Sequence, residues 1–335
     1  MSGDLDERLK KAGIRHFDVL IHDQPKEWLI ENFKKDRTEY PVNVSLLIRN
    51  IIWQVRERII NGQKPPLNEL IRTFWYMYIK STLSRAESLS MTRDQYLDMI
   101  QAFTDMVKKY ELMQYKDIGF RDDNEAHRKV GGNANIILFS EKLGHQAYLF
   151  EIAEKYNVSI MALGGQPSVL SAEYFVDLLK QTGVDIRRSF YLFSIVDYDP
   201  SGWIIKDAFR NNLHFYKVKN TRMFDLIHPD MLTPDEVKLA RIRIRTPKEM
   251  EAKNEAWLRE VHRRNYKNQI YLEEETKEGK IFYGLEAEAI SGKRLTTALE
   301  RDMVPVIGKS EDLLRIYELK QLDKSIKDLI IHLVT

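Results

Sequence analysis

Three carboxylates follow two apolar runs of this chain. The run NIILFS (residues 135–140) ends on Glu141, and the run FYLFSIV (residues 190–196) ends on Asp197, with Asp199 two residues later. Short apolar runs of this kind predict buried parallel strands, and open α/β sheets bind ligands at the carboxyl ends of such strands. Carboxylates gathered there repel one another unless a cation lies among them, and their oxygens suit Mg²⁺ together with substrate phosphates. The sequence therefore predicts a Mg²⁺ site and phosphoryl-transfer chemistry on a nucleotide or nucleic acid.

Strand and helix patterns alternate regularly around these carboxylates, beginning after the pair Gly131-Gly132. The predicted strands are 135–141, 158–163 and 190–196, and the predicted helices are 145–156, 171–182 and 200–211. Repeated strand–helix units make a parallel sheet with helices on both faces. Farther along, residues 242–265 are predicted to be mostly helical, and residues 281–334 to form a closing set of helices.

The first 130 residues have a different, helical pattern. Residues 1–40 are polar and mixed, which predicts an N-terminal extension. Three segments then carry apolar residues at helical spacing, namely 42–61, 67–85 and 92–110, the last with Thr92 as its expected N-cap. Three short helices joined by turns suit a helical or winged-helix DNA-binding module. We therefore predict an extension over 1–40, a winged-helix-like domain over 41–130 and an α/β domain over 131–335.

Composition excludes several classes of protein. The 335 residues include no cysteine, which excludes disulfides, thiolate zinc sites and cysteine nucleophiles. The chain begins without an apolar signal core and has no stretch as long as a membrane span, so we expect a cytoplasmic protein with no membrane partner. The eight histidines lack paired ligand spacing, and His127 and His145, the two nearest the acidic motif, are expected on helix surfaces rather than as zinc ligands.

Several short segments resemble one protein family in their order along the chain. Glu141 after one strand and Asp197-Tyr198-Asp199-Pro200-Ser201-Gly202 after a later strand fit an E…DxDxxG pattern. This pattern resembles the TOPRIM domain of topoisomerases, primases and related nucleases. The loop Gly165-Gln166-Pro167-Ser168 and the segment GLEAEA (residues 284–289) are similar to a GxPs turn and a KxExEAL-like segment of one branch. That branch comprises the A subunit of topoisomerase VI and the meiotic double-strand-break transesterase.

The resemblance covers roughly residues 42–300 and implies both a fold and a nucleophile. The implied fold is α/β, with a winged-helix-like helical domain before a Rossmann-like TOPRIM domain that ends in helices. Members of the family carry Arg-x-x-aromatic-Tyr in the helical domain, and Arg72-Thr73-Phe74-Trp75-Tyr76 fits this pattern. Tyr76 is therefore the implied nucleophile, with Arg72 as an electrostatic contributor. Relatives commonly have an acidic residue where this chain has Thr73, whereas Trp75 keeps the aromatic position.

Helical spacing supports Tyr76 independently. Arg72, Tyr76 and Lys80 follow one another at intervals of four residues and therefore share one helix face, where the two cations favour the approach of a phosphate. Tyr78, on the core side, and Tyr96 are the other candidate nucleophiles. Tyr96 follows Arg93-Asp94, but it comes one position too early for the family pattern and has no second aromatic after it. The stripe predicted to face the core consists of Leu70, Phe74, Met77 and Ser81.

The resemblance also implies a reaction. Tyr76 attacks a backbone phosphate of double-stranded DNA, displaces the 3′-hydroxyl and forms a 5′-phosphotyrosyl bond. Mg²⁺ held by Glu141, Asp197 and Asp199 stabilises charge on the phosphate and on the leaving oxygen. Lys142 is a further expected contact of the phosphate, and Lys80 is an expected contact of the DNA.

The expected partners follow from the same resemblance. In the family the tyrosine of one subunit works with the metal site of another, so a homodimer cuts both strands of the DNA. The chain has no ATP-binding signature, so any ATPase is expected to be a separate subunit, with residues 1–40 as its expected contact. The expected location is the cytoplasm, in association with the nucleoid.

Two alternatives remain open. The protein could be a TOPRIM nuclease that hydrolyses DNA with an activated water and uses Tyr76 only structurally. It could also be a non-catalytic DNA-binding homologue, although the complete E…DxD set argues against a decayed site. Covalent attachment of the protein to DNA distinguishes the transesterase from both.

Overall fold

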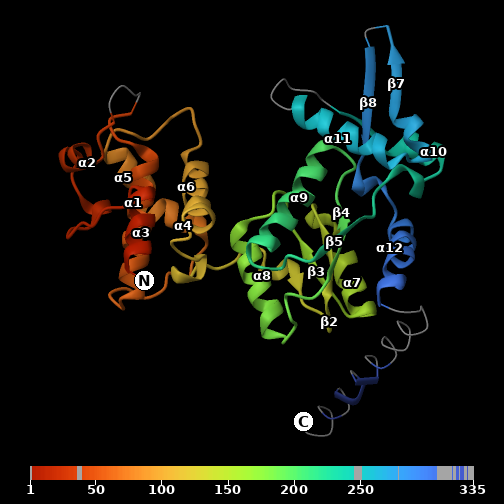
Figure 1. Ribbon diagram of the computed structural model, residues 1–335, viewed down its shortest axis with the longest axis horizontal. Helices are drawn as coiled ribbons and strands as arrows, with labels where there is room; N and C mark the ends of the chain where they lie inside the picture. Colours follow the sequence, from red (N-terminus) through yellow and green to blue (C-terminus); the bar gives the residue numbers. More distant parts are fainter. Residues whose placement is uncertain are drawn as a thin grey trace. The chain divides into compact units, whose positions relative to one another are not determined.

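A computed structural model describes residues 2–35, 40–244, 251–277 and 279–307, together with a few positions between 319 and 330. The chain divides into two compact units, Met1–Asp123 and Asn124–Thr335 (Figure 1). The division falls after Asp123, whereas the sequence predicts it after residue 130.

Unit 1, Met1–Asp123, is helical. The segment around Gly13 is held against the long helix α3 (Val44–Ile60), because the buried Asn50 amide donates a hydrogen bond to Gly13 O and accepts one from Arg15 N. Among the described residues of this unit, β-structure is limited to isolated bridges at Lys34–Val42 and Leu70–Arg121. Its α-helices are α1 (Ser2–Ala12), α2 (Lys26–Phe33), α3 (Val44–Ile60), α4 (Ile71–Phe74), α5 (Lys80–Arg85) and α6 (Gln95–Thr104).

The helix that carries Tyr76 contains a π-helical turn. Trp75–Ile79 forms this turn between α4 and α5, so the helix runs without a break from Ile71 to Arg85. Of the predicted core positions, Phe74 is buried, whereas Leu70, which precedes the helix, is exposed. Met77 and Ser81, within and after the wider turn, are also exposed. The residues that join Phe74 in the core are Trp75, Tyr78, Ile79, Thr82 and Leu83.

The third predicted helix also differs in detail. Helix α6 begins at Gln95, and the side chain of Asp94 rather than Thr92 accepts a hydrogen bond at its N-terminus. A second π-helical turn, Asp105–Lys109, follows α6 directly. The N-cap prediction was wrong because Asp94 is an equally good capping residue two positions later.

Unit 2 is built on a mixed five-stranded sheet of order β1-β3-β2-β4-β5. The last four strands in this order run parallel, and β1 is antiparallel to β3. The α/β class and the parallel core predicted from the apolar runs are confirmed. The strands are β1 (Arg128–Lys129), β2 (Asn133–Ser140), β3 (Val158–Ala162), β4 (Phe190–Ile195) and β5 (Thr221–Asp225).

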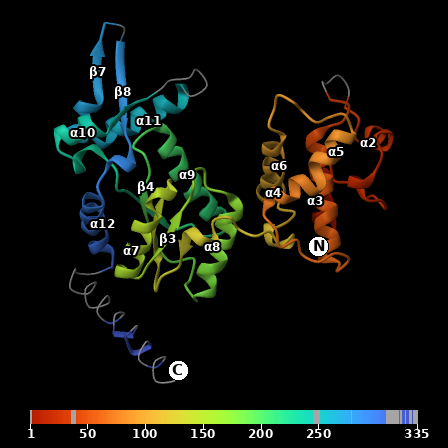
Figure 2. The ribbon, with the colours of Figure 1, turned by 180° about the vertical axis from the view of Figure 1, so that it is seen from behind.

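Helices cover both faces of this sheet (Figure 2). Side chains of α8 (Val169–Gln181) and α9 (Pro200–Phe215) form one apolar core with residues such as Phe139 and Leu192. Side chains of α7 (Gln146–Tyr156) and α12 (Gly292–Ile307) form the core on the other face, around Ile160 and Phe193.

The segment after the sheet differs from its prediction. Residues 242–265 begin in a strand, β6 (Arg241–Arg243), and only then enter α11 (Glu251–Arg264). Residues 281–285 are also extended, because β8 (Gly279–Leu285) pairs antiparallel with both β6 and β7 (Glu273–Thr276). The prediction of helices from residue 281 was therefore wrong at its start, and most of its part beyond residue 307 lies outside the described residues. Helix α10 (Pro234–Ala240) precedes β6.

No helix in the described part of the chain is long and apolar enough to span a membrane.

Candidate active site

The predicted carboxylates meet at one edge of the five-stranded sheet. Glu141 directly follows β2 and Asp197 follows β4, and these strands are neighbours whose ends are aligned by the pairing of Ser140 with Ile195. Burial raises the pKa of Glu141, and the charge of Asp197 raises it further. Burial likewise raises the pKa of Asp199, with the charge of Asp197 as a further contribution. Glu141, Asp197 and Asp199 therefore form one electrostatic group, as the sequence predicted.

Backbone contacts fix the loops that carry this group. The amide of Glu141 donates to Ile195 O at 3.1 Å, and its carbonyl accepts from Gly165 N at 2.9 Å. The loop Gly165–Ser168, singled out in the sequence, therefore reaches the same sheet edge. Asp199 caps α9, and its Oδ1 accepts a hydrogen bond from Gly202 N at 2.7 Å.

The oxygens of Asp197 both have partners within the chain. Oδ1 accepts from Ala287 N at 2.8 Å, and Oδ2 lies 3.2 Å from Lys142 Nζ. Burial opposes the charge on Lys142, but Asp197 outweighs that effect and raises the pKa of the lysine overall. Lys142, predicted to contact a phosphate, here neutralises a carboxylate.

The donor set fits a hard divalent cation in its chemistry. Glu141 Oε2 is buried without a hydrogen-bond partner, so an oxygen donor is left over at the sheet edge. A buried carboxylate oxygen in this state calls for a proton or a cation. Across the part of the chain that the structure describes, however, no three Asp, Glu or His side chains converge closely enough to hold one ion. The ion pair between Lys142 and Asp197 engages one of the oxygens that such an ion would need.

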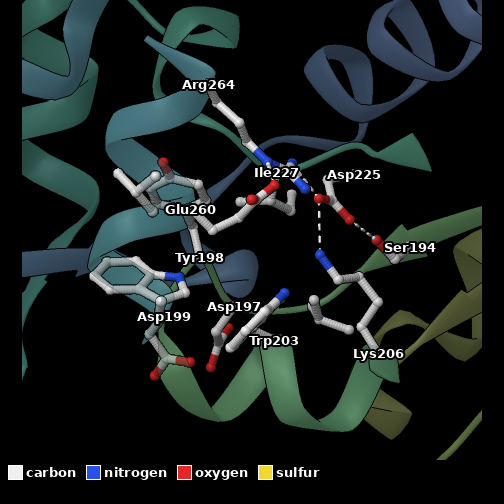
Figure 3. A pocket seen from close by; sticks show the side chains of 13 residues that line it. Ser194, Asp197, Tyr198, Asp199, Trp203, Lys206, Asp225, Ile227, Glu260 and Arg264 are labelled. Atoms are coloured by element: carbon white, nitrogen blue, oxygen red, sulfur yellow. Dashed lines mark hydrogen bonds and ion pairs between the residues drawn. The ribbon is translucent and has the colours of Figure 1, made fainter. Parts of the chain in front are cut away.

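Tyr198, between the two aspartates, anchors the loop to the end of β8. Its amide donates to Leu285 O at 2.9 Å, and its carbonyl accepts from Leu285 N at 3.2 Å. Its buried hydroxyl donates to Gln269 Oε1 at 3.1 Å, and its ring lies 5.6 Å from the ring of Trp257. Figure 3 shows Tyr198 together with Asp197 and Asp199. This role of Tyr198 was not predicted. The only signal in the sequence is the apolar run around β8, for which a helix was predicted.

A fourth acidic residue and a buried histidine complete the edge. A Cβ at Gly144 would lie 2.9 Å from Glu288 Oε1, which places the Glu288 carboxylate beside the loop after Glu141.

His145 is buried, at 9% exposed, and its Nδ1 has no hydrogen-bond partner. Burial lowers the pKa of His145, against the raising effect of Glu288 and Asp197. The prediction of His145 as a helix-surface residue was wrong, because the turn Leu143–His145 directs it toward the carboxylates before α7 begins. His127 is half-buried, and its Nδ1 lies 2.7 Å from Gln146 Oε1.

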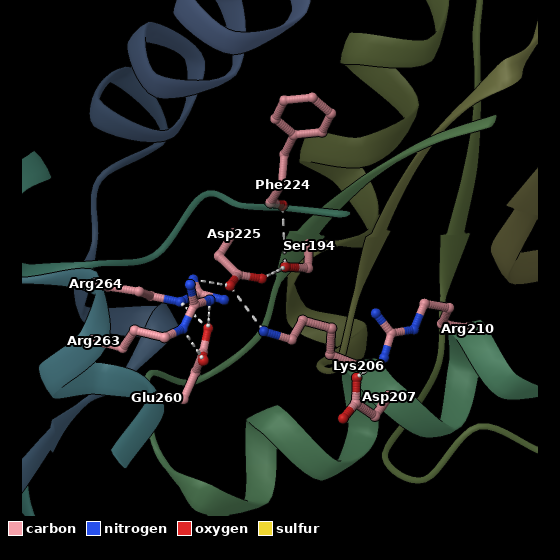
Figure 4. Close-up of polar contacts among 9 residues, drawn as sticks. All are labelled: Ser194, Lys206, Asp207, Arg210, Phe224, Asp225, Glu260, Arg263 and Arg264. Atoms are coloured by element: carbon pink, nitrogen blue, oxygen red, sulfur yellow. Dashed lines mark hydrogen bonds and ion pairs between the residues drawn. The ribbon is translucent and has the colours of Figure 1, made fainter. Parts of the chain in front are cut away.

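A buried ion cluster lies beside the aspartate loop. Asp225, at the end of β5, is 2.8 Å from Lys206 Nζ, also pairs with Arg264, and accepts a hydrogen bond from Ser194 Oγ at 3.0 Å (Figure 4). Burial opposes the charge of Asp225, but the two cations outweigh it and lower the pKa of this carboxyl overall. A small pocket of about 30 Å³ is lined both by this cluster and by Asp197 and Asp199. The sequence pattern after residue 213 gave no sign of the cluster.

Tyr76 has the surroundings predicted for it, within unit 1. Its side chain is 52% exposed, and Lys80 Nζ lies 5.4 Å from the centre of its ring. A hydrogen bond from Arg72 to the Tyr76 side chain raises the pKa of Arg72. The Arg72 guanidinium also lies 5.5 Å from the ring of Tyr96, which itself packs edge-on against Trp75. The structure thus brings Tyr76, Arg72 and Lys80 together, and Tyr78 is buried as predicted.

The helix face that carries Arg72, Tyr76 and Lys80 also includes a π-helical turn. Tyr76 lies within the turn Trp75–Ile79, and single π-turns inside α-helices are frequent at functional sites. Nothing in the sequence pattern indicated it. Tyr76, Arg72 and Lys80 belong to unit 1, whereas the carboxylates and Lys142 belong to unit 2.

No protein-family model matches the chain, and neither a curated protein nor a solved structure matches it.

Proposed function

We propose that this protein is the DNA-cleaving subunit of a topoisomerase VI-like enzyme, which breaks both strands of DNA by tyrosine transesterification. The observation that carries the proposal is the electrostatic group of Glu141, Asp197 and Asp199 at the ends of two neighbouring parallel strands, with one buried oxygen of Glu141 left without a partner. In this proposal unit 1 is a winged-helix-like domain and unit 2 is a TOPRIM domain.

The proposed reaction exchanges one phosphate ester for another. The hydroxyl oxygen of Tyr76 attacks a backbone phosphorus of double-stranded DNA and loses its proton, while the bond from phosphorus to the 3′-oxygen breaks and that oxygen takes up a proton. Arg72 and Lys80, which contact Tyr76, hold the phosphate beside the attacking hydroxyl. The product is a 5′-phosphotyrosyl bond and a free 3′-hydroxyl, which reseals the strand in the reverse reaction.

The carboxylates supply the second half of the proposed site. Glu141, Asp197 and Asp199 would hold Mg²⁺, which neutralises charge on the phosphate and on the leaving oxygen. As in the family that the sequence resembles, we propose a homodimer in which each subunit's tyrosine works with its partner's carboxylates. The ATPase of such an enzyme would be a separate subunit, and the complex would act on DNA in the cytoplasm.

The test looks for protein linked to the 5′ ends of cleaved DNA. Purified protein is incubated with labelled duplex and Mg²⁺, and the reaction is stopped with detergent. We expect covalent adducts with the wild type and none with Tyr76→Phe or Glu141→Gln. Tyr110→Phe is the matched control, because it removes a tyrosine hydroxyl from the same unit, one that accepts a hydrogen bond from Arg49 Nη1 at 3.2 Å and lies outside the proposed site. Cleavage with free ends that survives Tyr76→Phe would instead identify a hydrolytic nuclease.

A further inference from the structure

The Lys142 side chain lies among the carboxylates that, in the proposed function, bind a metal ion. Its Nζ lies 3.2 Å from Asp197 Oδ2, and no other residue of the described chain forms an ion pair with Asp197. We propose that Lys142 is an exchangeable internal counter-ion: it neutralises the site before metal arrives, and it moves from Asp197 to a DNA phosphate when the metal binds. The DNA half of this inference rests on the proposed function, whereas the metal half does not.

The charges at the sheet edge require such a counter-ion. Glu141 and Asp197 follow neighbouring strands whose ends pair at Ser140 and Ile195, and the Glu288 carboxylate lies beside the loop after Glu141. Carboxylates gathered at one sheet edge repel one another unless a cation lies near them. Lys142 is the residue that supplies positive charge here, one position after Glu141 along the chain.

The same ion pair explains why the carboxylates do not present a complete set of free oxygens to a cation. Asp197 Oδ1 is engaged by Ala287 N and Oδ2 by Lys142, so a cation must displace the lysine to use Oδ2. The backbone hydrogen bond to Oδ1 leaves the carboxylate oriented while this happens. A variant without the ammonium should therefore bind a divalent cation more tightly, which is the opposite of what damage to the site would cause.

The geometry of Lys142 suits an exchange. Its side chain is 30% exposed, whereas that of Asp197 is 11% exposed, so the lysine is the more solvent-accessible member of the pair. The backbone of Lys142 is held, because its carbonyl accepts from Ser140 Oγ at 2.8 Å, and only the flexible four-carbon stem needs to move. An ammonium released there meets the phosphate that approaches the metal.

An exchange of this kind couples metal binding to DNA binding. A phosphate that takes Lys142 frees Asp197 for the metal, and a metal that takes Asp197 frees Lys142 for the phosphate. Because linkage is reciprocal, DNA should raise metal affinity by the same factor by which metal raises DNA affinity. The site would then acquire its metal mainly on DNA.

The first experiment uses Mn²⁺ alone and no DNA. Free Mn²⁺ is measured by electron paramagnetic resonance in titrations of wild type, Lys142→Met and Lys142→Arg. We expect Lys142→Met to lower the Kd for Mn²⁺ about tenfold, as for removal of a partly buried competing ion pair, and Lys142→Arg to stay near wild type. An equal or higher Kd for Lys142→Met, or no binding in either protein, would overturn the proposal.

Lys155→Met is the matched control. It removes the same charge from an ion pair of similar length, 3.3 Å to Glu300, in the same unit. We expect its Kd for Mn²⁺ to stay within about twofold of wild type. A tightening equal to that of Lys142→Met would show a general charge effect and would refute a specific role for Lys142.

The second experiment adds duplex DNA in the Tyr76→Phe background, which prevents transesterification. We expect DNA to lower the Kd for Mn²⁺ when Lys142 is present and to leave it unchanged in Lys142→Met. Equal effects of DNA on both proteins would refute the exchange. If Lys142→Met tightens Mn²⁺ binding while wild type never forms an adduct, the counter-ion role stands and the proposed function fails.

Discussion

Replacement of Gly284 by alanine should disturb the aspartate loop from a distance of more than eighty residues along the chain. Gly284 lies in β8, and its pairing with Ile242 of β6 keeps it in place. A Cβ built there would lie 2.6 Å from Tyr198 O and 3.0 Å from Asp199 Cβ. Neither contact can be relieved by rotation of a flexible side chain, because both atoms belong to, or directly adjoin, the backbone of the loop.

The size of the disturbance follows from these distances. An ordinary contact of a Cβ begins near 3.4 Å, so Tyr198 O and residue 284 must separate by about 0.8 Å. Overpacking of this kind typically costs about 1–3 kcal/mol of unfolding free energy. Functional sites tolerate displacements of only about 0.5 Å. A misplacement of about 1 Å can lower a rate about a hundredfold.

Three measurements test Gly284→Ala: urea unfolding, the Kd for Mn²⁺, and the rate of adduct formation with DNA. We expect a loss of about 1–3 kcal/mol in stability, together with a higher Kd and a slower rate. Gly292→Ala is the matched control, since a Cβ there would meet only ring carbons of Tyr148 at 3.8 and 4.0 Å. If Gly284→Ala binds Mn²⁺ and cleaves DNA like wild type, β8 does not position the aspartates.

Three further predictions concern Asp225 and Tyr96. Asp225→Asn should lower the unfolding free energy by about 3–5 kcal/mol at pH 7, because Lys206, only 8% exposed, loses a charged partner. In urea unfolding, the double variant Asp225→Asn with Lys206→Met should lose less unfolding free energy than Asp225→Asn alone. The pKa of Asp225 is lower in the folded protein than in the unfolded chain, where it is about 3.9. The ionised carboxylate therefore stabilises the fold above pH ~3.9, and this stabilisation disappears as the pH falls through the folded pKa. In acid titrations below pH ~4, the unfolding free energy of Asp225→Asn should therefore fall less steeply with pH than that of wild type. Tyr96→Leu should slow adduct formation about two- to fivefold by removing the ring beneath Arg72, whereas Tyr96→Phe keeps that ring and should react like wild type.

The sheet and its carboxylates could be predicted because they depend on local patterns. Short apolar runs marked the strands of the parallel core, and chain direction in a parallel sheet then placed Glu141 and Asp197 at one edge. The exposed face of Arg72, Tyr76 and Lys80 could be predicted for the same reason, since residues four apart share a face in an α-helix and also nearly so across one π-turn.

The remaining features depend on contacts that no local pattern records. The π-turn at Trp75–Ile79 shifted the core stripe, and an apolar period counted for a regular α-helix cannot reveal it. Strand β8 is extended because β6 and β7 pair with it, and IFYGL alone is too short to distinguish a strand from a buried helix. The burial of His145 follows from the turn before α7, which a helical pattern starting at residue 145 does not show.

The glycines of the acidic motif are explained by the same packing. A Cβ at Gly202 would lie 2.1 Å from Asp197 O, so the first turn of α9 can fold back on the aspartate loop only with glycine at this position. Gly284 serves the other side of the loop, against Tyr198 O. The backbone of α9 thus approaches the aspartate loop on one side and the backbone of β8 on the other, and neither has a side chain at the point of contact. The aspartates are fixed between these two segments. A DxD pair that lacked these two neighbours would be only a helix cap and an exposed carboxylate. We infer that the glycine of DxDxxG, together with the distant glycine of β8, distinguishes a preorganised carboxylate site from an ordinary strand end.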